Sequence, residues 1–497
     1  MKSSPTPRPT DIEKIFRRTA RTFALLFGIA FAAVSVLRID LTPLASASQS
    51  ADAEWRELYV QLAAHARDGL LFITLLLIAL DLFYRYWTGI VGKLLAAETR
   101  RFLIVLAVLV FATRMAWVLL SGTIPWADAQ WYHELAIGLS NGLGYLNEHG
   151  RPTAYWPPGY PAFLSILYRL FGAHVSVGQV ANAILSFFQV LLVYLFSRRV
   201  FSEKGARIAS LLLTFSVGNA AYAGSLMSEV PLGFLLSLIL YHCAKRTIID
   251  FRTFDLVIFG LLVGLGALVR PVMLVLPIAL LLTMMKAGIK WNRLLASAAL
   301  MACVISVTLL PNVLRNYALF RSFVPISTNG GINLWIGNNP DATGSYMPPP
   351  PLALSGNEAE QSDAAFRAGL TWIAGHPAAA VVTLFKKVVH LYYRDDQGIL
   401  FSLVRTQGSL LWPVSFGLIL MANLFYYSVF GVALYQIWAR RATLSPEAYL
   451  LAAVSVMMTL FYLIYFGADR FHMPLWPIGA CFAAEWISAN ALHSPSS

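Results

Sequence analysis

Long apolar runs separated by short polar connections recur along almost the whole chain. A helix needs about 20 mostly apolar residues to cross the hydrocarbon core of a bilayer, with a range of about 17–25. By this rule the pattern predicts about twelve membrane-spanning helices. The predicted spans are Thr22–Ile39, Gly69–Trp87, Phe102–Leu120, Val175–Ser197, Ile208–Tyr222, Leu226–Ala244, Phe254–Val269, Pro271–Met285, Leu294–Leu314, Leu410–Trp438, Tyr449–Phe466 and Phe471–Ala489.

The composition agrees with a chain whose solvent is lipid. Of its 497 residues 58% are hydrophobic and only 12% are charged, whereas about a quarter of the residues of a soluble domain are charged. The sequence therefore predicts an all-α polytopic membrane protein, with membrane lipid as a constant partner.

Positive charge orients the predicted spans, because cytoplasmic loops are enriched in Lys and Arg. The basic residues between Lys2 and Arg21 place the N-terminus in the cytoplasm, and the C-terminus follows it there. The other basic connections are 85–101, 198–207, 245–252, 286–293 and 440–441. This distribution explains the net charge of +12 by orientation and anionic lipid, so nucleic acid is not an expected partner.

These basic connections share one side only if two shorter apolar stretches, Tyr160–Gly172 and Ala378–Tyr393, do not cross the membrane. The second stretch carries Lys386 and Lys387 in its middle, where charge is costly at bilayer depth. Both are therefore predicted to be helices at the outer interface.

The expected organisation follows from this sidedness. Two elaborate outer loops, 121–173 and 315–408, face the extracytoplasmic side. The regions are a cytoplasmic tail (1–21), two N-terminal helices with a basic loop (22–101), a membrane domain with both outer loops (102–490) and a second cytoplasmic tail (491–497).

Asp128 follows a predicted span and precedes a predicted helix, which allows two interpretations. It can cap that helix, since Asp is favoured at N-caps. It can also act as a general base at the outer mouth of the bundle, where a rigid carboxylate can reach a reacting hydroxyl. The two roles are compatible.

The same loop is rich in aromatic side chains and continues through His133 to Tyr155 and Trp156, ahead of three prolines. Such aromatics suit the flat face of a sugar, or they form an ordinary aromatic belt at the membrane interface. We keep both interpretations and take the three residues as candidate substrate contacts.

Glu229 lies at the outer start of a predicted span, where a carboxylate is costly unless it is paired. Arg270, at the outer end of a later span, is one candidate partner, and the cations of the second loop are others. Arg270 is either a structural partner or a ligand for an anionic substrate.

The second loop contains Asn338 and Asn339 in a turn-like Gly-Asn-Asn-Pro segment, whose carboxamides suit hydroxyls and phosphates. Cations on the same side are Lys386, Lys387 and Arg470, with His472 close to the last of them. Each could simply extend to a lipid headgroup. Their convergence away from the cytoplasmic side favours an anionic ligand.

Several short motifs together resemble the GT-C membrane glycosyltransferases. The closest branch is bacterial, with lipid A aminoarabinose transferases, rhizobial lipopolysaccharide galacturonosyltransferases and relatives of protein O-mannosyltransferases. The resemblance covers about 102–489. It implies that the membrane domain 102–490 is catalytic, that the two N-terminal helices are extra to it, and that the membrane is a bacterial inner membrane. Its motifs are Asp128 after a span, Tyr155-Trp-Pro-Pro-Gly-Tyr-Pro161, Ser228-Glu-Val-Pro231, Arg270-Pro271, Gly337-Asn-Asn-Pro340 and Arg470-Phe-His-Met-Pro-Leu-Trp-Pro477.

The resemblance implies a GT-C-like bundle that transfers a sugar, with inversion, from a polyprenyl-phosphate-linked donor. The acceptor would be lipopolysaccharide or another envelope glycan or protein. Asp128 matches the catalytic acid and Glu229 the second acidic position of the family. Many relatives carry a further acid directly after the first, where this chain has Ala129, so a divalent metal ion is possible and its ligands stay open.

The residues fit this chemistry, since a hydroxyl needs a base and a leaving phosphate needs cations. Asp128 is the expected base, and Arg270, Lys386, Lys387 and Arg470 are the expected phosphate ligands. The main alternative is a transporter or flippase of a lipid-linked sugar, and a second is a scaffold subunit without catalysis. The clustering of polar residues on one side favours the enzyme.

Overall fold

The computed structural model describes residues 9–37, 39–41, 53–348, 350–352, 355–408 and 410–490. Within these ranges the protein contains helices and no β-strand, and isolated bridges join Thr123 to Thr406 and Leu146 to Pro152. The predicted all-α polytopic membrane fold is confirmed. Of the predicted cytoplasmic tails, 1–21 and 491–497, residues 1–8 and 491–497 lie outside the described residues, and residues 9–21 belong to the first helix.

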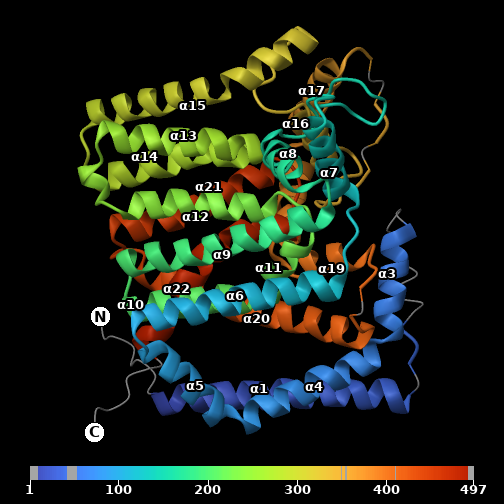
Figure 1. Cartoon of the computed structure of the whole chain (residues 1–497), viewed down its shortest axis with the longest axis vertical. Helices are drawn as coiled ribbons and strands as arrows, with labels where there is room; N and C mark the ends of the chain where they lie inside the picture. Colours follow the sequence, from blue (N-terminus) through green and yellow to red (C-terminus); the bar gives the residue numbers. More distant parts are fainter. Residues whose placement is uncertain are drawn as a thin grey trace.

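Most helices run side by side along one direction (Figure 1). These bundle helices are α1 (Pro9–Val36), α4 (Ala66–Leu82), α6 (Thr99–Ser121), α9 (Val175–Val200), α10 (Glu203–Phe215), α12 (Glu229–Ala244), α13 (Thr253–Val269), α14 (Leu276–Lys286), α15 (Trp291–Phe320), α20 (Trp412–Arg440), α21 (Pro446–Ile464) and α22 (Trp476–Asn490). Each overlaps one predicted apolar run.

The remaining elements are shorter. They are α3 (Ala53–Ala64), α5 (Tyr84–Ala96), α7 (Ala127–Ser140), α8 (Gly159–Phe171), α11 (Val217–Ala221), α16 (Asn329–Gly337), α17 (Glu358–Gly375), α18 (Pro377–Tyr392), α19 (Gln397–Leu403) and the 3-10 helices η1 (Tyr222–Gly224), η2 (Ile248–Asp250), η3 (Pro271–Val275) and η4 (Asp469–Leu475).

Length and composition alone single out fewer spans than the predicted number. Among the described residues, 6 helices are long and apolar enough to cross a membrane, or up to 9 if three bent helix pairs count as one span each. Several bundle helices are shorter, including α10 and α22. These helices are largely buried against their neighbours, so packing within the protein supplements their short apolar lengths.

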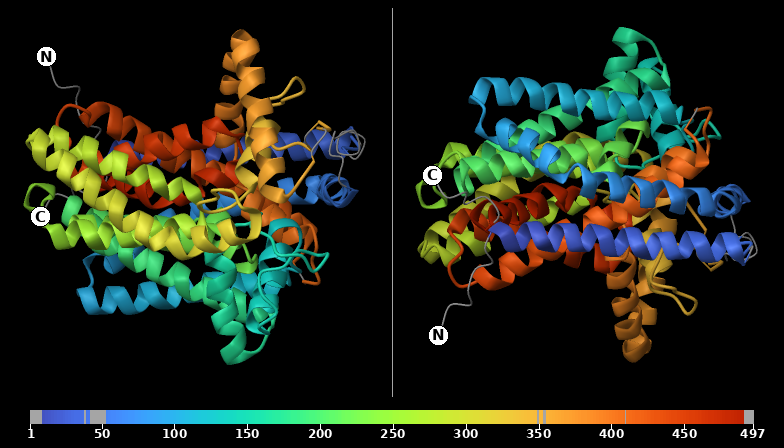
Figure 2. Two further views of the ribbon diagram at one scale, coloured as in Figure 1. Left: turned by 90° about the horizontal axis from the view of Figure 1, so that it is seen from above. Right: turned by 90° about the horizontal axis from the view of Figure 1, so that it is seen from below.

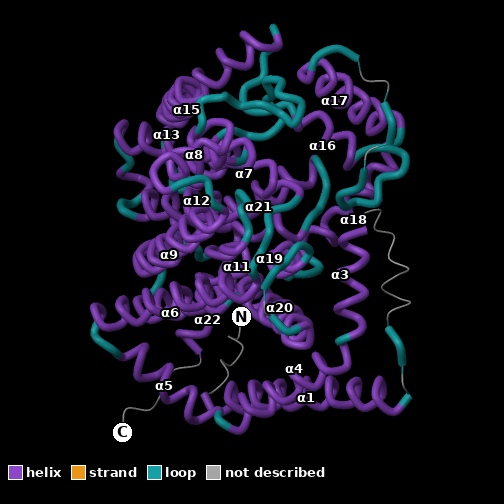
Figure 3. The backbone as a smooth tube through the Cα atoms, turned by 45° about the vertical axis from the view of Figure 1, so that its right-hand side comes forward, coloured by secondary structure: helices purple, strands orange, loops and turns teal. Residues whose placement is uncertain are grey.

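The two ends of the bundle differ. The connections at 198–207, 245–252 and 286–293 lie at one end, which we call the basic end (Figure 1). The loops at 121–173 and 315–408 gather at the opposite end, the loop end, where non-helical backbone is concentrated (Figure 3). This separation matches the sidedness predicted from charge.

The two stretches predicted to lie at an interface form α8 and α18. Both belong to helical segments that run across the bundle direction, with α7 and α8 projecting to one side and α17 and α18 to the other (Figure 2). The helices α17 and α18 meet at a bend of 111°. The interfacial placement of α8 and α18 stays a prediction.

The N-terminal region is more elaborate than the predicted pair of helices. Helix α1 packs against α4, and α4 packs against α20. The carboxylate of Asp81 accepts from Arg17 at 2.9 Å and from Arg21 at 2.8 Å, which joins α4 to α1. In addition, α3 bends away from α4 by 60° and stands across the loop end beside α19 (Figure 1).

Candidate active site

Asp128 lies at the loop end and forms an ion pair with Arg470. Its Oδ2 atom is 2.7 Å from Arg470 Nη1, and the two side chains are 19% and 16% exposed. The predicted N-cap role is wrong: Trp126, in extended conformation, is the N-cap of α7, and Asp128 stands in the first turn. That position still favours a carboxylate, because the helix N-terminus carries positive partial charge.

A second ion pair joins Glu229 to Arg270. Glu229 begins α12 and is fully buried, and its Oε1 atom is 2.6 Å from Arg270 Nη2. Arg270 also donates from Nε to Ser228 Oγ at 2.8 Å. The pairing that the sequence suggested is therefore present. It joins the start of α12 to the residue that follows α13.

Phe471 brings the two ion pairs together. The guanidinium carbon of Arg270 lies 5.4 Å from the centre of the Phe471 ring, and that of Arg470 lies 5.3 Å from it. Phe471 also stacks on Tyr462 with 4.5 Å between ring centres. Both arginines thus adjoin one aromatic ring in a partly dehydrated place, where charge interactions are stronger than in water.

Aromatic residues of the first loop adjoin these charges. Tyr132 lies 5.7 Å from Trp156 between ring centres, and Trp156 lies 5.0 Å from Tyr155. Burial, together with the nearby carboxylate of Asp128, raises the pKa of Tyr155 to about 12. The Tyr155 hydroxyl therefore remains protonated at neutral pH and can donate a hydrogen bond to a ligand.

Two charged residues hold this loop in place. Glu358 accepts from Thr153 Oγ1 at 2.8 Å and from the Ala154 amide at 3.0 Å, and also accepts from Thr328. Arg315 donates to the Thr153 carbonyl at 2.9 Å. The second outer loop and α15 thus fix the segment that carries Tyr155 and Trp156.

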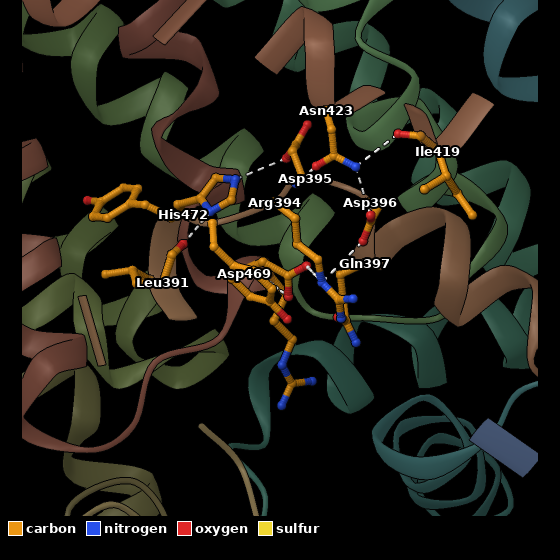
Figure 4. A network of polar contacts seen from close by, with 12 residues as sticks. Leu391, Arg394, Asp395, Asp396, Gln397, Ile419, Asn423, Asp469 and His472 are labelled. Carbon is orange, nitrogen blue, oxygen red and sulfur yellow. Dashed lines mark hydrogen bonds and ion pairs between the residues drawn. The ribbon is translucent and has the colours of Figure 1, made fainter. Parts of the chain in front are cut away.

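A buried polar network anchors η4, the element that carries Arg470 (Figure 4). Arg394 Nε lies 3.0 Å from Asp469 Oδ2 and 3.3 Å from Asp396 Oδ1. His472 is bonded through Nε2 to Asp395 Oδ1 at 3.0 Å and through Nδ1 to the Leu391 carbonyl at 2.6 Å. Residues on both sides of Arg470 are therefore tied to the end of α18 and the start of α19.

Several predicted ligands are instead committed to internal contacts. Lys387 is buried, and its Nζ atom donates to Asn338 Oδ1 at 2.8 Å and to the Leu463 carbonyl at 3.2 Å. Asn339 donates from Nδ2 to backbone carbonyls of the preceding helix, α16. His472 is fully buried in the network described above. These side chains stabilise the fold, since their polar atoms already have partners inside the protein.

Of two other predicted residues, one contacts a neighbouring helix and one lies at the surface. His133 Nδ1 is 2.7 Å from the Tyr168 hydroxyl, which joins α7 to α8. Lys386 is exposed on α18. The structure thus brings together Asp128, Arg470, Glu229 and Arg270, with Tyr155 and Trp156 beside them.

The possible metal ion finds no ready ligand set. In the described part of the chain, no three His, Cys, Asp or Glu side chains are grouped so that they could hold one ion. The carboxylates of Asp128 and Glu229 face arginines instead. Within the described residues, the two carboxylates of the site therefore form ion pairs rather than part of a metal-ligand group.

Comparison with known families gives one sequence match. Residues 156–314 match the family model of dolichyl-phosphate-mannose-protein mannosyltransferases. The match covers about a third of the chain and includes Trp156, Glu229 and Arg270, but neither Asp128 nor Arg470. Over this segment the predicted glycosyltransferase resemblance is confirmed. No curated protein sequence was found to be similar to the chain.

Two solved structures illustrate the overall likeness. The oligosaccharyltransferase AglB from Archaeoglobus fulgidus, in complex with an inhibitory peptide and a dolichol-phosphate, is 16% identical, with a TM-score of 0.48 over 82% of this chain and 50% of that one. ArnT from Cupriavidus metallidurans, bound to undecaprenyl phosphate, is 14% identical, with a TM-score of 0.42 over 79% of each chain. The chain thus spans about half the length of the archaeal enzyme. Likenesses of this degree do not bear on the site.

Sequence reasoning missed the residues that position the site. Trp126, Phe401 and Phe471 look like ordinary membrane-protein aromatics, and Asp395 and Asp396 follow a helix predicted only as an interfacial segment. One signal was available: two adjacent aspartates after an arginine are unusual beside apolar runs and suggest a buried charge network.

Proposed function

We propose that the protein is a glycosyltransferase that moves a sugar from a polyprenyl-phosphate carrier to a hydroxyl group of a cell-envelope acceptor. The observation that carries this proposal is the pair of adjacent ion pairs, Asp128 with Arg470 and Glu229 with Arg270, whose arginines both adjoin Phe471. One carboxylate and two guanidinium groups at one place supply a base and a phosphate site together.

Asp128 is the proposed general base. Its Oδ2 atom accepts from Arg470, and within the described residues its Oδ1 atom accepts no hydrogen bond. That oxygen is free to accept the proton of an acceptor hydroxyl, and a base positioned in this way contributes about 10²–10⁴-fold to the rate. Arg470 keeps the carboxylate oriented while the proton moves.

Arg270 and Arg470 are the proposed ligands of the carrier phosphate. A guanidinium group can contact a phosphate through two parallel N–H bonds, and each of these arginines keeps further N–H groups besides those used in its ion pair. Glu229 holds Arg270 in place through its 2.6 Å bond and acts as a positioning residue. The exposed Lys386 can add charge at the rim.

The reaction then balances without another reactant. The acceptor oxygen attacks the anomeric carbon of the sugar, its proton passes to Asp128 Oδ1, and the bond between that carbon and the phosphate oxygen breaks. The electron pair leaves with the phosphate, whose growing charge is stabilised by both arginines. Attack from the face opposite the phosphate inverts the anomeric configuration.

The family match supports the class of donor, because the family is named for a polyprenyl-phosphate-linked sugar. Tyr155 and Trp156 offer a surface on which a sugar ring can lie. The proposed place of the reaction is the extracytoplasmic face of a bacterial inner membrane, with both termini in the cytoplasm. Lipopolysaccharide, another envelope glycan or a protein hydroxyl is the proposed acceptor.

The test compares lipids and envelope glycans from cells with the wild-type protein, Asp128→Asn protein, Asp363→Asn protein or none. Asp363 is a matched control, because it pairs with Arg367 at 2.8 Å on the exposed face of α17. We expect Asp128→Asn cells to lack one sugar on a glycan and to accumulate polyprenyl-phosphate-sugar, as cells without the protein do, while Asp363→Asn cells resemble wild type.

Normal transfer by Asp128→Asn protein, at equal amounts in the membrane, would refute the base assignment. The flippase alternative has one feature in its favour, the 119° break between 217–224 and α12 that precedes Glu229. A flippase would leave sugar-loaded carrier on the cytoplasmic leaflet when it fails. Accumulation on the outer leaflet in Asp128→Asn cells supports the transferase.

A further inference from the structure

Helix α3 lies outside the domain predicted to be catalytic, yet it reaches the candidate site. It bends away from α4 and stands across the loop end, next to α19 (Figures 1 and 3). Its Leu58 and Leu62 are buried in a small core with Ile399, Leu400 and Leu403 of α19. The helix is therefore packed on the element that borders Arg470.

Trp55 makes the contacts that extend from α3 toward the site. Its ring lies edge-on to Trp126, with 5.4 Å between centres, and edge-on to Phe401, with 5.9 Å. Trp126 and Phe401 also stack on each other at 4.9 Å, and Trp126 Nε1 donates to the Phe401 carbonyl at 3.0 Å. The three rings form one cluster, which we call the aromatic brace.

Each partner of Trp55 adjoins one member of the Asp128–Arg470 pair. Trp126 is the N-cap of α7, two residues before Asp128. Phe401 lies under Arg470, with 5.7 Å between its ring centre and the guanidinium carbon. The aromatic brace therefore connects the backbone of the proposed base with the side chain of its cation.

The backbone between Trp126 and Asp128 also needs support from neighbouring contacts. Ala127, between Trp126 and Asp128, has φ of +47°, a left-handed conformation that costs an L-residue about 1–2 kcal/mol. Strained backbone persists where surrounding contacts hold it. The Trp126 side chain, fixed by Phe401 and Trp55, supplies such contacts.

A backbone joint lies directly beside the brace and is also held by α3. The amide of Ile124 donates to the Arg405 carbonyl at 2.9 Å, and that of Gln407 donates to the Gly122 carbonyl at 3.0 Å. Arg405 Nε contacts both carboxylate oxygens of Glu54, at 2.7 and 2.8 Å. Glu54 thus holds the joint and Trp55 holds the aromatic brace, from adjacent positions of one helix.

We propose that α3 is a part of the active site and that Trp55 is a positioning residue for the Asp128–Arg470 pair. The chemical role given to that pair rests on the proposed function, whereas the mechanical link does not. On this proposal the N-terminal helices are more than membrane anchors, because α3 forms part of the wall of the site.

The test uses the full chain in lipid nanodiscs and four forms: wild type, Trp55→Ala, Trp55→Phe and Trp412→Ala. Trp412 is a matched control, since it is half-buried in the same small core and stacks on His65 at the other end of α3. Amide hydrogen exchange is measured for peptides covering 122–134 and 399–408, and sugar transfer is measured in cells at equal protein amounts.

For Trp55→Ala we expect exchange in these peptides to be about tenfold faster, from the loss of two aromatic contacts. We expect transfer to fall about tenfold or more, because small misplacement of a catalytic group is costly. Trp55→Phe should restore most of both, since a smaller ring can still pack there. Trp412→Ala should leave exchange in 122–134 unchanged.

Unchanged exchange in Trp55→Ala protein, or equal acceleration by Trp412→Ala, would overturn the link between α3 and the site. Faster exchange with normal transfer would overturn the positioning role, provided that Asp128→Asn abolishes transfer. If exchange accelerates while Asp128→Asn protein transfers normally, the link is supported and the proposed function fails. The two hypotheses are therefore separable in one series.

Discussion

Asp128 and Arg470 lie 342 positions apart in the sequence, and their side chains meet with 2.7 Å between Oδ2 and Nη1. The contact joins the first outer loop to the connection between the last two bundle helices. Because Arg470 also adjoins Phe401 and Phe471, its side chain has little freedom to move. The proposed base and a proposed phosphate ligand are thereby held next to each other.

Replacing Arg470 tests this arrangement. We expect Arg470→Gln to lower transfer about 10²–10³-fold, as loss of a positioned charge donor does. Arg470→Lys should recover only a small part, because a lysine lacks the planar fork that can contact a carboxylate and a phosphate together. Product glycan is measured at equal protein amounts.

Arg367→Gln is the control for that series, since Arg367 forms an exposed ion pair on α17. Equal activity of Arg470→Lys and wild-type protein would show that only the charge of this residue matters.

The buried pair of Glu229 and Arg270 should matter for both stability and activity. Removing one partner of a buried pair costs about 3–5 kcal/mol, so we expect Glu229→Gln to lower the melting temperature in detergent. The double variant Glu229→Gln, Arg270→Gln should regain part of this loss, because no unpaired charge remains, but it should stay inactive. Thermal unfolding and transfer are measured for the singles and the double.

If the double variant were about as active as wild type, Arg270 would not be a ligand of the phosphate. If the loss of stability in the double variant equals the sum of the losses in the two single variants, the Glu229 and Arg270 side chains have no coupling energy.

His133 makes stability depend on pH. Burial lowers the pKa of His133 below its ordinary value, against the weaker opposite effect of Glu134. As the pH falls through about 6.5, the unfolded chain takes up a proton that the folded chain binds less readily, so the folded state loses stability. We expect the melting temperature of His133→Gln protein to fall less than that of wild type between pH 7.5 and about 5.5.

The exposed His149 of the same loop is the control, because its ring lies in water. A His149→Gln variant that flattens the pH profile as much as His133→Gln would contradict this prediction.

Lys386 and Lys387 are neighbours in sequence with different predicted effects. Lys387→Met leaves the Asn338 side chain and the Leu463 carbonyl without a donor that they now have, which costs about 1–3 kcal/mol. We therefore expect Lys387→Met to lower the melting temperature, whereas Lys386→Met should leave it nearly unchanged. Thermal unfolding of both variants in detergent is compared with transfer.

If Lys387→Met protein had normal stability but impaired transfer, Lys387 would instead be supported as a phosphate ligand, which is the role that the sequence suggested. Impaired transfer in Lys386→Met protein would support a role for that exposed charge at the rim.

The sequence by itself determined that the chain is an all-α membrane protein with apolar runs where the bundle helices lie, and that polar loops gather at one end. These properties follow from local physics: the transfer of about 20 residues into lipid and the uneven distribution of Lys and Arg. The helical stretches around Tyr160 and Lys386 were predicted in the same way, because their length and charge argue against crossing.

Only the tertiary structure decided which charges meet. Arg470 reaches Asp128 and Arg270 reaches Glu229, while Lys387 turns inward to Asn338 and becomes part of the core. The proposed role of α3 could not be predicted from the sequence either, since it depends on the contacts of Trp55 with Trp126 and Phe401. The physical reason is that the partner of a side chain depends on the packing of segments tens to hundreds of residues apart, whereas burial in lipid depends on each segment alone.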